Sequence, residues 1–115
     1  KLYSKHIYLK YTVNEFKIYI ESLWKLWMNW DNRGNKKGCW VIDHIIPLNF
    51  FIKNKYYNLE VIHSLINLRP ISMIDNRKKQ DKLIKELCIP VINKLIEKYP
   101  EELQLLKLRE KIKNV

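Results

Sequence analysis

A carboxylate and an imidazole are adjacent at Asp43 and His44, and an amide follows further along the chain at Asn76. Asp43 offers a hard carboxylate oxygen and Asn76 a neutral carbonyl oxygen, and two such ligands leave room for water and phosphate oxygens, which suits Mg²⁺. A metal held there would stabilise the charge that develops as a phosphodiester is cleaved. His44 has a reference pKa of about 6.5, so it is mostly neutral at physiological pH and could take a proton from the attacking water. These residues predict metal-dependent phosphodiester hydrolysis.

Two further polar side chains would support the same site. The amide of Asn67 can donate and accept at once, and could tie the loop before it to the following strand so that the imidazole is held at a fixed angle. Lys79 lies three residues after Asn76 on the same helix face and would add a positive charge near the phosphate. Each residue also has an ordinary structural explanation: an ion pair for Asp43 and His44, a turn for Asn67, a cap for Asn76. Together, those explanations require several coincidences.

The site needs strand ends and a helix start that converge. Residues 40–46 are β-branched and apolar and predict a strand that Pro47 ends, and residues 67–71 predict a second strand. Ser72 can cap the helix that follows and carries Asn76, where helix N–H groups favour an anion. Neighbouring residues of a strand point to opposite faces, so the carboxylate and the imidazole can serve one site only if the first strand ends at His44.

The remaining pattern predicts an α+β fold in a single domain of 115 residues. Thr12 and Glu15 form a capping box that opens a helix over residues 12–28, whose aromatic stripe, including Trp24 and Trp27, is expected to face the core. Further expected elements are an arm or short strand over 1–11, a loop over 31–38, a helix over 59–65 capped by Asn58, and helices over 90–99 and 100–113 opened by Pro90 and Pro100. The apolar faces expected in the last two helices are Ile92, Leu95, Ile96, Leu103 and Leu106.

The charge balance points to a polyanionic partner. There are 22 Lys and Arg residues against 12 Asp and Glu, a net charge of +10, and nucleic acid is the commonest partner of such a surface. A generally basic surface, or codon usage of an AT-rich genome, would explain the same excess. From Asp75 to Lys82 every residue is polar, so the start of that helix is not expected to lie in an apolar core. Candidate contacts to DNA phosphates are Arg33, Lys36, Lys37, Arg77, Lys78 and Lys82.

Cysteine usage and hydropathy bound the class of protein. Cys39 and Cys88 form no C-x-x-C pair, so no structural zinc is expected. Two free thiols in an intracellular protein are expected, with a disulfide between them as the alternative. No run of about 18 apolar residues is present, so no membrane span is expected. The sequence starts at Lys1 without a signal peptide, which suggests a piece of a longer protein, possessing a separate DNA-recognition module elsewhere.

The stretches WVIDHIIPL and NLRPISMIDNRKKQDK resemble the HNH endonucleases, also called ββα-metal or His-Me finger nucleases, most closely the branch of phages and large viruses that includes homing endonucleases. The resemblance covers about residues 14–82. It rests on the nine-residue spacing from Asn67 to Asn76, the N-x-x-K run that ends at Lys79, and an aromatic helix that leads to MNWDNRG. It implies a ββα-metal core over 40–88 with a short inserted helix, flanked by the 12–28 and 90–113 helices. It also implies His44 as general base, Asp43 and Asn76 as ligands of Mg²⁺ (with Mn²⁺ as a substitute), and Asn67 as loop anchor.

The sequence also departs from the family pattern. The third signature position, Asn76, is asparagine in place of histidine, and the spacing from His44 to Asn67 is longer than in compact members. Related viral proteins often carry a histidine three residues before the Asn67 position; here Ser64 stands there and the histidine is His63. His63 and His6 are interpreted as surface or core histidines without a catalytic role.

The resemblance implies an enzyme that hydrolyses DNA and nicks one strand per active site. Two alternatives remain: a DNA-binding module that keeps the fold without cleaving, and a toxin-type nuclease acting on general DNA or RNA. Target sequence and oligomeric state are not predicted by any motif.

Overall fold

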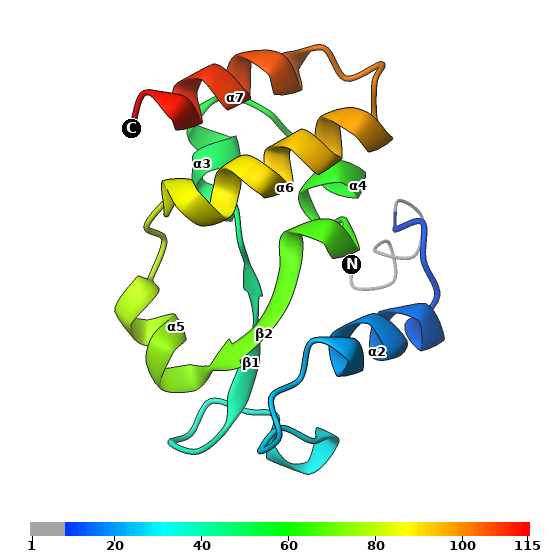
Figure 1. Cartoon of the computed structure of the whole chain (residues 1–115), viewed down its shortest axis with the longest axis vertical. Helices are drawn as coiled ribbons and strands as arrows, with labels where there is room; N and C mark the ends of the chain where they lie inside the picture. Colours follow the sequence, from blue (N-terminus) through cyan, green and yellow to red (C-terminus); the bar gives the residue numbers. More distant parts are fainter. Residues whose placement is uncertain (1–8) are drawn as a thin grey trace.

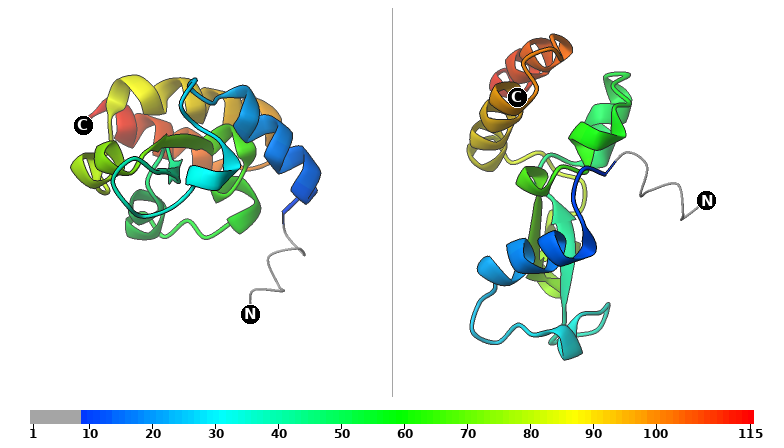
Figure 2. Two further views of the ribbon diagram at one scale, coloured as in Figure 1. Left: turned by 90° about the horizontal axis from the view of Figure 1, so that it is seen from below. Right: turned by 90° about the vertical axis from the view of Figure 1, so that its right-hand side faces the viewer.

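A two-stranded antiparallel sheet runs through the middle of the molecule, with helices at both of its ends (Figure 1). This computed structural model describes residues 9–115, so most of the expected N-terminal arm, with His6, lies outside the described residues. Helices and strands both contribute, which confirms the α+β class. The helices α6 (Lys85–Lys98) and α7 (Gln104–Lys113) lie at one end of the sheet. Helix α2 (Val13–Ser22) and the loop before strand β1 (Trp40–His44) lie toward the other end (Figure 2).

The two strands are β1 (Trp40–His44) and β2 (Leu68–Ser72), and their register places Ile42 opposite Pro70 and His44 opposite Leu68. Proline is tolerated because both strands of a two-stranded sheet are edge strands. β1 ends at His44, two residues before the predicted limit of its apolar run. Beyond it the ladder is replaced by a hydrogen bond from the Ile45 N–H to the Asn67 carbonyl, 2.8 Å long.

Helix α2 (Val13–Ser22) begins as predicted: the Thr12 hydroxyl accepts from the Glu15 N–H, and the Glu15 carboxylate accepts from the Thr12 N–H. The predicted extension to residue 28 is wrong, because the helix ends at Ser22. The chain then turns, and the Trp24 ring packs edge-on against the indole rings of Trp30 and Trp40. Trp27 was expected in the buried stripe and is 41% exposed.

The segment between the strands forms three short elements: α3 (Leu48–Lys53), α4 (Leu59–Ile62) and a 3₁₀ turn, η3 (Leu65–Asn67). Asn58 caps α4 as predicted, its side-chain oxygen accepting from the Glu60 N–H. The helix is shorter than the predicted 59–65, because the chain leaves the α conformation at the C-cap, His63, and tightens into η3 before β2.

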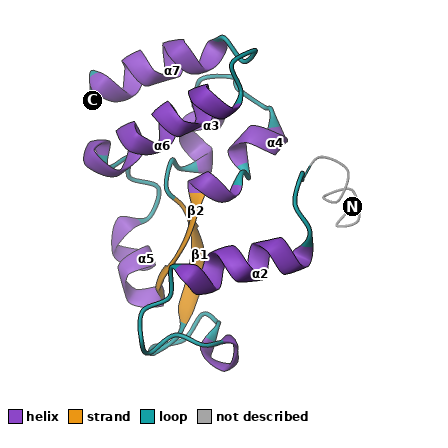
Figure 3. Ribbon diagram, turned by 45° about the vertical axis from the view of Figure 1, so that its right-hand side comes forward, coloured by secondary structure: helices purple, strands orange, loops and turns teal. Residues whose placement is uncertain are grey.

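Helix α5 (Met73–Lys79) follows β2 without a loop and begins at the predicted cap, where the Ser72 hydroxyl accepts from the Asp75 N–H. α5 and α2 lie on opposite sides of the strands (Figure 3). One residue of the polar stretch after Asp75 departs from expectation: Lys79 is buried, with 7% of its surface exposed.

The C-terminal helices are α6 (Lys85–Lys98) and α7 (Gln104–Lys113), and both differ from the predicted bounds. Pro90 does not open a helix but lies inside α6, on its exposed side. A helical proline costs about 3 kcal/mol, whereas burying one large apolar side chain contributes about 2 kcal/mol. α6 buries several on its other face: Cys88, Val91, Ile92 and Leu95. Burial therefore outweighs the lost hydrogen bond.

Pro100 likewise precedes α7 by four residues instead of opening it. The predicted apolar face of this helix is also wrong, because Leu103 is 70% exposed and Leu106 is 42% exposed. The face that packs on the core is offset from it and consists of Leu105, Leu108 and Ile112. The tail nevertheless packs against the domain as an amphipathic hairpin with α6.

Apolar burial occurs in two clusters, one toward each end of the strands. The larger joins the segment after β1, α3, α4, α6 and α7, and contains Ile46 and Phe51. The smaller consists of Ile20, Met28 and Trp40 with partly buried indole rings around them. No helix among residues 9–115 is long and apolar enough to cross a membrane. The candidate site lies where β1 leaves the smaller cluster and enters the larger one.

Candidate functional site

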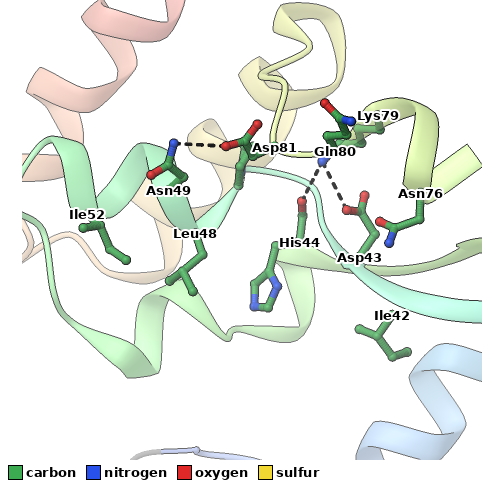
Figure 4. A pocket seen from close by; sticks show the side chains of 11 residues that line it. Ile42, Asp43, His44, Leu48, Asn49, Ile52, Asn76, Lys79, Gln80 and Asp81 are labelled. Atoms are coloured by element: carbon green, nitrogen blue, oxygen red, sulfur yellow. Dashed lines mark hydrogen bonds and ion pairs between the residues drawn. The ribbon is translucent and has the colours of Figure 1, made fainter. Parts of the chain in front are cut away.

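A pocket of about 400 Å³ lies at the end of β1, between α3 and α5 (Figure 4). β1 contributes Asp43 and His44 to its wall, and α5 contributes Asn76 and Lys79. These four residues come from sequence positions up to 36 apart. The structure therefore brings together four of the five residues that the sequence predicted to act together. The fifth, Asn67, lies behind the pocket.

Asp43 is buried, with 6% of its surface exposed, and both of its carboxylate oxygens are bonded to cations. Oδ2 accepts from Arg69 Nε at 2.9 Å, and Oδ1 accepts from Lys79 Nζ at 3.1 Å. Arg69 stands directly opposite Asp43 in the strand register, which accounts for the first contact. A buried carboxylate needs such partners, because removing an unpaired charge from water is unfavourable.

The position of Lys79 differs from the expected one. Its ammonium was predicted to face a phosphate, but it is buried beside Asp43 and also donates to the His44 carbonyl oxygen at 3.2 Å. Lys79 thus connects the end of α5 to two consecutive residues at the end of β1. Its charge is partly neutralised by Asp43, which leaves less of it available to an anion in the pocket.

Asn76 is half-buried on α5, and its amide lies beside the Asp43 carboxylate (Figure 4). The two oxygen donors therefore face the same part of the pocket, as a shared cation requires. The pocket also contains the Asp81 carboxylate, which accepts from the Asn49 amide at 3.2 Å. Among the described residues, no group of three or more His, Cys, Asp or Glu side chains lies close enough to hold a metal.

The donor chemistry fits a hard divalent cation with few protein ligands. One carboxylate and one amide oxygen, with the remaining positions open to water and phosphate, is a set that Mg²⁺ accepts. The charges of Arg69 and Lys79 act against any such cation, because both lie within about 3 Å of the Asp43 oxygens. The residue types therefore fit Mg²⁺. Because Arg69 and Lys79 are positively charged, we expect Mg²⁺ to bind weakly until anionic oxygens of a phosphate also coordinate it.

The imidazole of His44 leaves β1 on a different side from the Asp43 carboxylate (Figure 4). The expectation from the sequence, that the two side chains turn to the same side, is wrong. His44 is still paired with Leu68 in the sheet, so neighbouring side chains of the strand continue to alternate there. Both residues nevertheless border the pocket, and the imidazole also borders a smaller one that contains Tyr11 and His63.

His44 contacts a second histidine. Its Nε2 lies 2.9 Å from Nδ1 of His63, and the ring centroids are 5.0 Å apart in an edge-to-face arrangement. Burial lowers the pKa of His44 to about 4, and the charge of His63 lowers it as well; Asp43 opposes this shift and Lys79 adds to it. The imidazole is therefore neutral at neutral pH, which is the state that can accept a proton.

Asn67 is completely buried, and its amide is fully used in hydrogen bonds. Oδ1 accepts from the Ile46 N–H at 2.7 Å, and Nδ2 donates to the carbonyls of Ile46 and Ile62 at 3.2 and 3.0 Å. The side chain thus joins the segment that follows His44 to the end of α4, which precedes His63. These are the contacts expected of a loop anchor.

The six basic residues proposed to contact DNA are all exposed. Arg33, Lys36 and Lys37 belong to the loop before β1, and the Arg33 guanidinium lies 5.7 Å from the centre of the Trp40 ring. Arg77 on α5 donates to the Asn35 carbonyl at 3.4 Å, which brings the basic side of α5 next to that loop. Lys78 follows Arg77 in the last turn of α5, and Lys82 lies after the helix.

Two residues of the site were not among the sequence candidates. Arg69 could have been found by pairing the strands antiparallel, because the register puts it opposite Asp43. His63 could have been found from the family pattern, in which a histidine often stands at the position of Ser64. Because His63 is one residue away from that position, it was not assigned a role. Its contact with His44 depends on the path of the inserted segment, which no local pattern predicts.

Comparisons with known proteins add little about activity. No family model matches the sequence, and no solved structure matches it. The chain is similar to an uncharacterized protein of Acanthamoeba polyphaga mimivirus, 31% identical over 105 residues, which is 90% of this chain and 44% of that relative. The chain therefore spans less than half the length of this viral relative, and the similarity indicates a shared domain.

Proposed function

We propose that this chain is a metal-dependent HNH endonuclease domain with a ββα-metal core, which hydrolyses one DNA strand per active site. The observation that carries the proposal is the meeting of Asp43, His44 and Asn76 at one pocket. The first two residues come from β1, and Asn76 comes from α5, which directly follows the antiparallel partner strand β2. Strand, strand and helix in that order, with these residue types at the junction, is the arrangement that the resemblance implies.

In this proposal His44 is the general base. It takes a proton from a water molecule as that water attacks phosphorus, and its neutral state at neutral pH allows it to do so. The pKa of about 4 makes it a weak base in the free protein. A phosphate bound nearby would raise the pKa, because a negative charge favours the imidazolium form.

Asp43 and Asn76 would hold Mg²⁺ in this pocket. When bound, this ion neutralises phosphate charge and stabilises the leaving oxygen. The imidazole and the carboxylate leave β1 in different directions (Figure 4), which suits a displacement in which the attacking and leaving oxygens lie on opposite sides of phosphorus. Lys79 holds Asp43 and the His44 carbonyl in place and is a positioning residue here.

DNA is the proposed partner, bound through its phosphates by the exposed basic residues of the loop before β1 and of α5. Phosphate contacts supply affinity without sequence information. Sequence recognition would then come from other parts of a longer protein, in keeping with the greater length of the viral relative.

The test is nicking of supercoiled plasmid with Mg²⁺ and with excess EDTA. Wild-type protein is expected to nick only with the metal, and His44→Ala is expected to lose nicking while DNA affinity stays near the wild-type value. Asn76→Ala should shift the Mg²⁺ dependence to higher concentration, whereas Asn49→Ala, which removes an amide of the same pocket, should not. Unimpaired nicking by His44→Ala would remove the imidazole from the mechanism.

One observation favours a second candidate, a DNA-binding module that keeps the fold without cleaving. The Asp43 carboxylate already has two cationic partners, Arg69 and Lys79, and could be a purely structural ion cluster. This candidate predicts DNA binding that is indifferent to EDTA and no nicking with any divalent metal.

A further inference from the structure

The side chain of His63 meets the imidazole of His44 end to end, with 2.9 Å between Nδ1 of His63 and Nε2 of His44. We propose that His63 is a positioning residue for His44: its Nδ1 accepts the hydrogen bond of His44 Nε2–H and thereby leaves His44 Nδ1 as the nitrogen that accepts the proton of the attacking water. This inference rests on the proposed nuclease function and assigns a role that the sequence pattern did not.

The number of protons on two neutral imidazoles limits how the rings can bond to each other. Each ring has one N–H and one lone pair, so a hydrogen bond between the two rings needs one donor and one acceptor. If His63 donated, the bond would use the Nε2 lone pair of His44, and its Nδ1 would carry the proton. No basic nitrogen would then remain on His44. Only the arrangement in which His44 donates gives a general base.

The burial of the pair strengthens this choice. His44 is half-buried, and the small pocket beside its ring is lined by apolar and aromatic side chains such as Leu9 and Phe16, together with Arg33. Nδ1 of His63 lies at hydrogen-bond distance from Nε2, so an N–H on that nitrogen has a protein acceptor in the half-buried pair. When His44 takes up the proton of the attacking water, the same acceptor faces an imidazolium and its hydrogen bond becomes charge-assisted.

The backbone of His63 is held on several sides, as a positioning residue requires. Its N–H donates to the Leu59 carbonyl at 3.0 Å, and its own carbonyl accepts from the Tyr11 hydroxyl at 2.8 Å. The carbonyl of the preceding residue, Ile62, accepts from the Asn67 amide, which also binds Ile46. One buried side chain therefore fixes the segments that carry both histidines relative to each other.

A purely structural role would make a different prediction, because the two rings also touch edge to face. Three substitutions separate hydrogen bonding from ring packing. His63→Phe keeps the ring and removes the acceptor, His63→Asn keeps an acceptor near the Nδ1 position and removes the ring, and His63→Ala removes both. We expect kcat for plasmid nicking to fall about 10- to 100-fold in the Phe and Ala variants. The Asn variant should stay within about threefold of wild type, and KM for DNA should be unchanged throughout.

A second measurement does not depend on activity. In ¹⁵N-labelled wild-type protein, the ring nitrogen shifts of His44 should report the tautomer protonated at Nε2, and His63→Phe should lose that preference. A wild-type His44 protonated at Nδ1 would overturn the proposal, as would equal kcat for the His63→Phe and wild-type proteins. If wild-type protein does not nick DNA with Mg²⁺, the proposed function itself fails and the role of His63 with it. If wild type nicks and His63→Phe nicks equally well, only the role of His63 fails.

Discussion

Replacing Asn67 by alanine should destabilise the whole domain, whatever the protein catalyses. The side chain is completely buried and makes three hydrogen bonds, one with the Ile46 N–H and two with the carbonyls of Ile46 and Ile62. Alanine removes all three and leaves a buried N–H and buried carbonyls without that partner. At about 1 kcal/mol for each hydrogen bond, the free energy of unfolding should fall by about 3 kcal/mol. For a domain of this size, the unfolding midpoint should fall by about 12 °C.

Urea unfolding followed by circular dichroism would measure this change as a shift of the transition midpoint with an unchanged slope. Asn58→Ala is the matched control, because that asparagine makes one capping hydrogen bond, with the Glu60 N–H at 3.1 Å. Its loss should cost about 1 kcal/mol. If Asn67→Ala costs no more than the Asn58 control, the two segments are held together without the Asn67 side chain and the anchor role is wrong.

Two further predictions concern the charges of the site. The folded pKa of His44, about 4, lies below its unfolded value, so the unfolded state takes up a proton first as pH falls; stability should drop by up to about 3 kcal/mol between pH 6.5 and 4. His44→Gln should show a smaller drop over this range in calorimetry, and an identical pH dependence would contradict the shift. Lys79→Met should cost about 2 kcal/mol, because it leaves Asp43 with Arg69 alone. Lys78→Met on the exposed side should stay within about 0.5 kcal/mol of wild type in the same urea assay.

Local chemistry in the sequence determined much of the fold. Thr12 with Glu15, Asn58 and Ser72 begin their helices as predicted, because a cap needs only the residue and the N–H groups two or three positions later. The two strands were also recognised, since β-branched and apolar runs have few other local options. The contact between β1 and α5 was also predictable, because α5 directly follows the short strand β2, which pairs with β1.

Other features were decided only by the tertiary structure. Pro90 is tolerated inside α6 because the opposite face of that helix packs on the core, and the end of α2 depends on where the indole ring of Trp24 finds its partners. Both features depend on how much apolar surface is buried between segments far apart in the sequence, and helix propensity does not measure that burial.

In the candidate site, too, the sequence determined some features and the tertiary structure decided others. The sequence determined that a carboxylate, an imidazole and an amide were present at spacings able to serve one pocket. Only the tertiary structure placed Arg69 and Lys79 on the Asp43 carboxylate and the His63 ring against His44. The physical reason is that hydrogen bonds and ion pairs between side chains act over about 3 Å, so they depend on strand register and on the path of the inserted segment. Residue types alone specify neither.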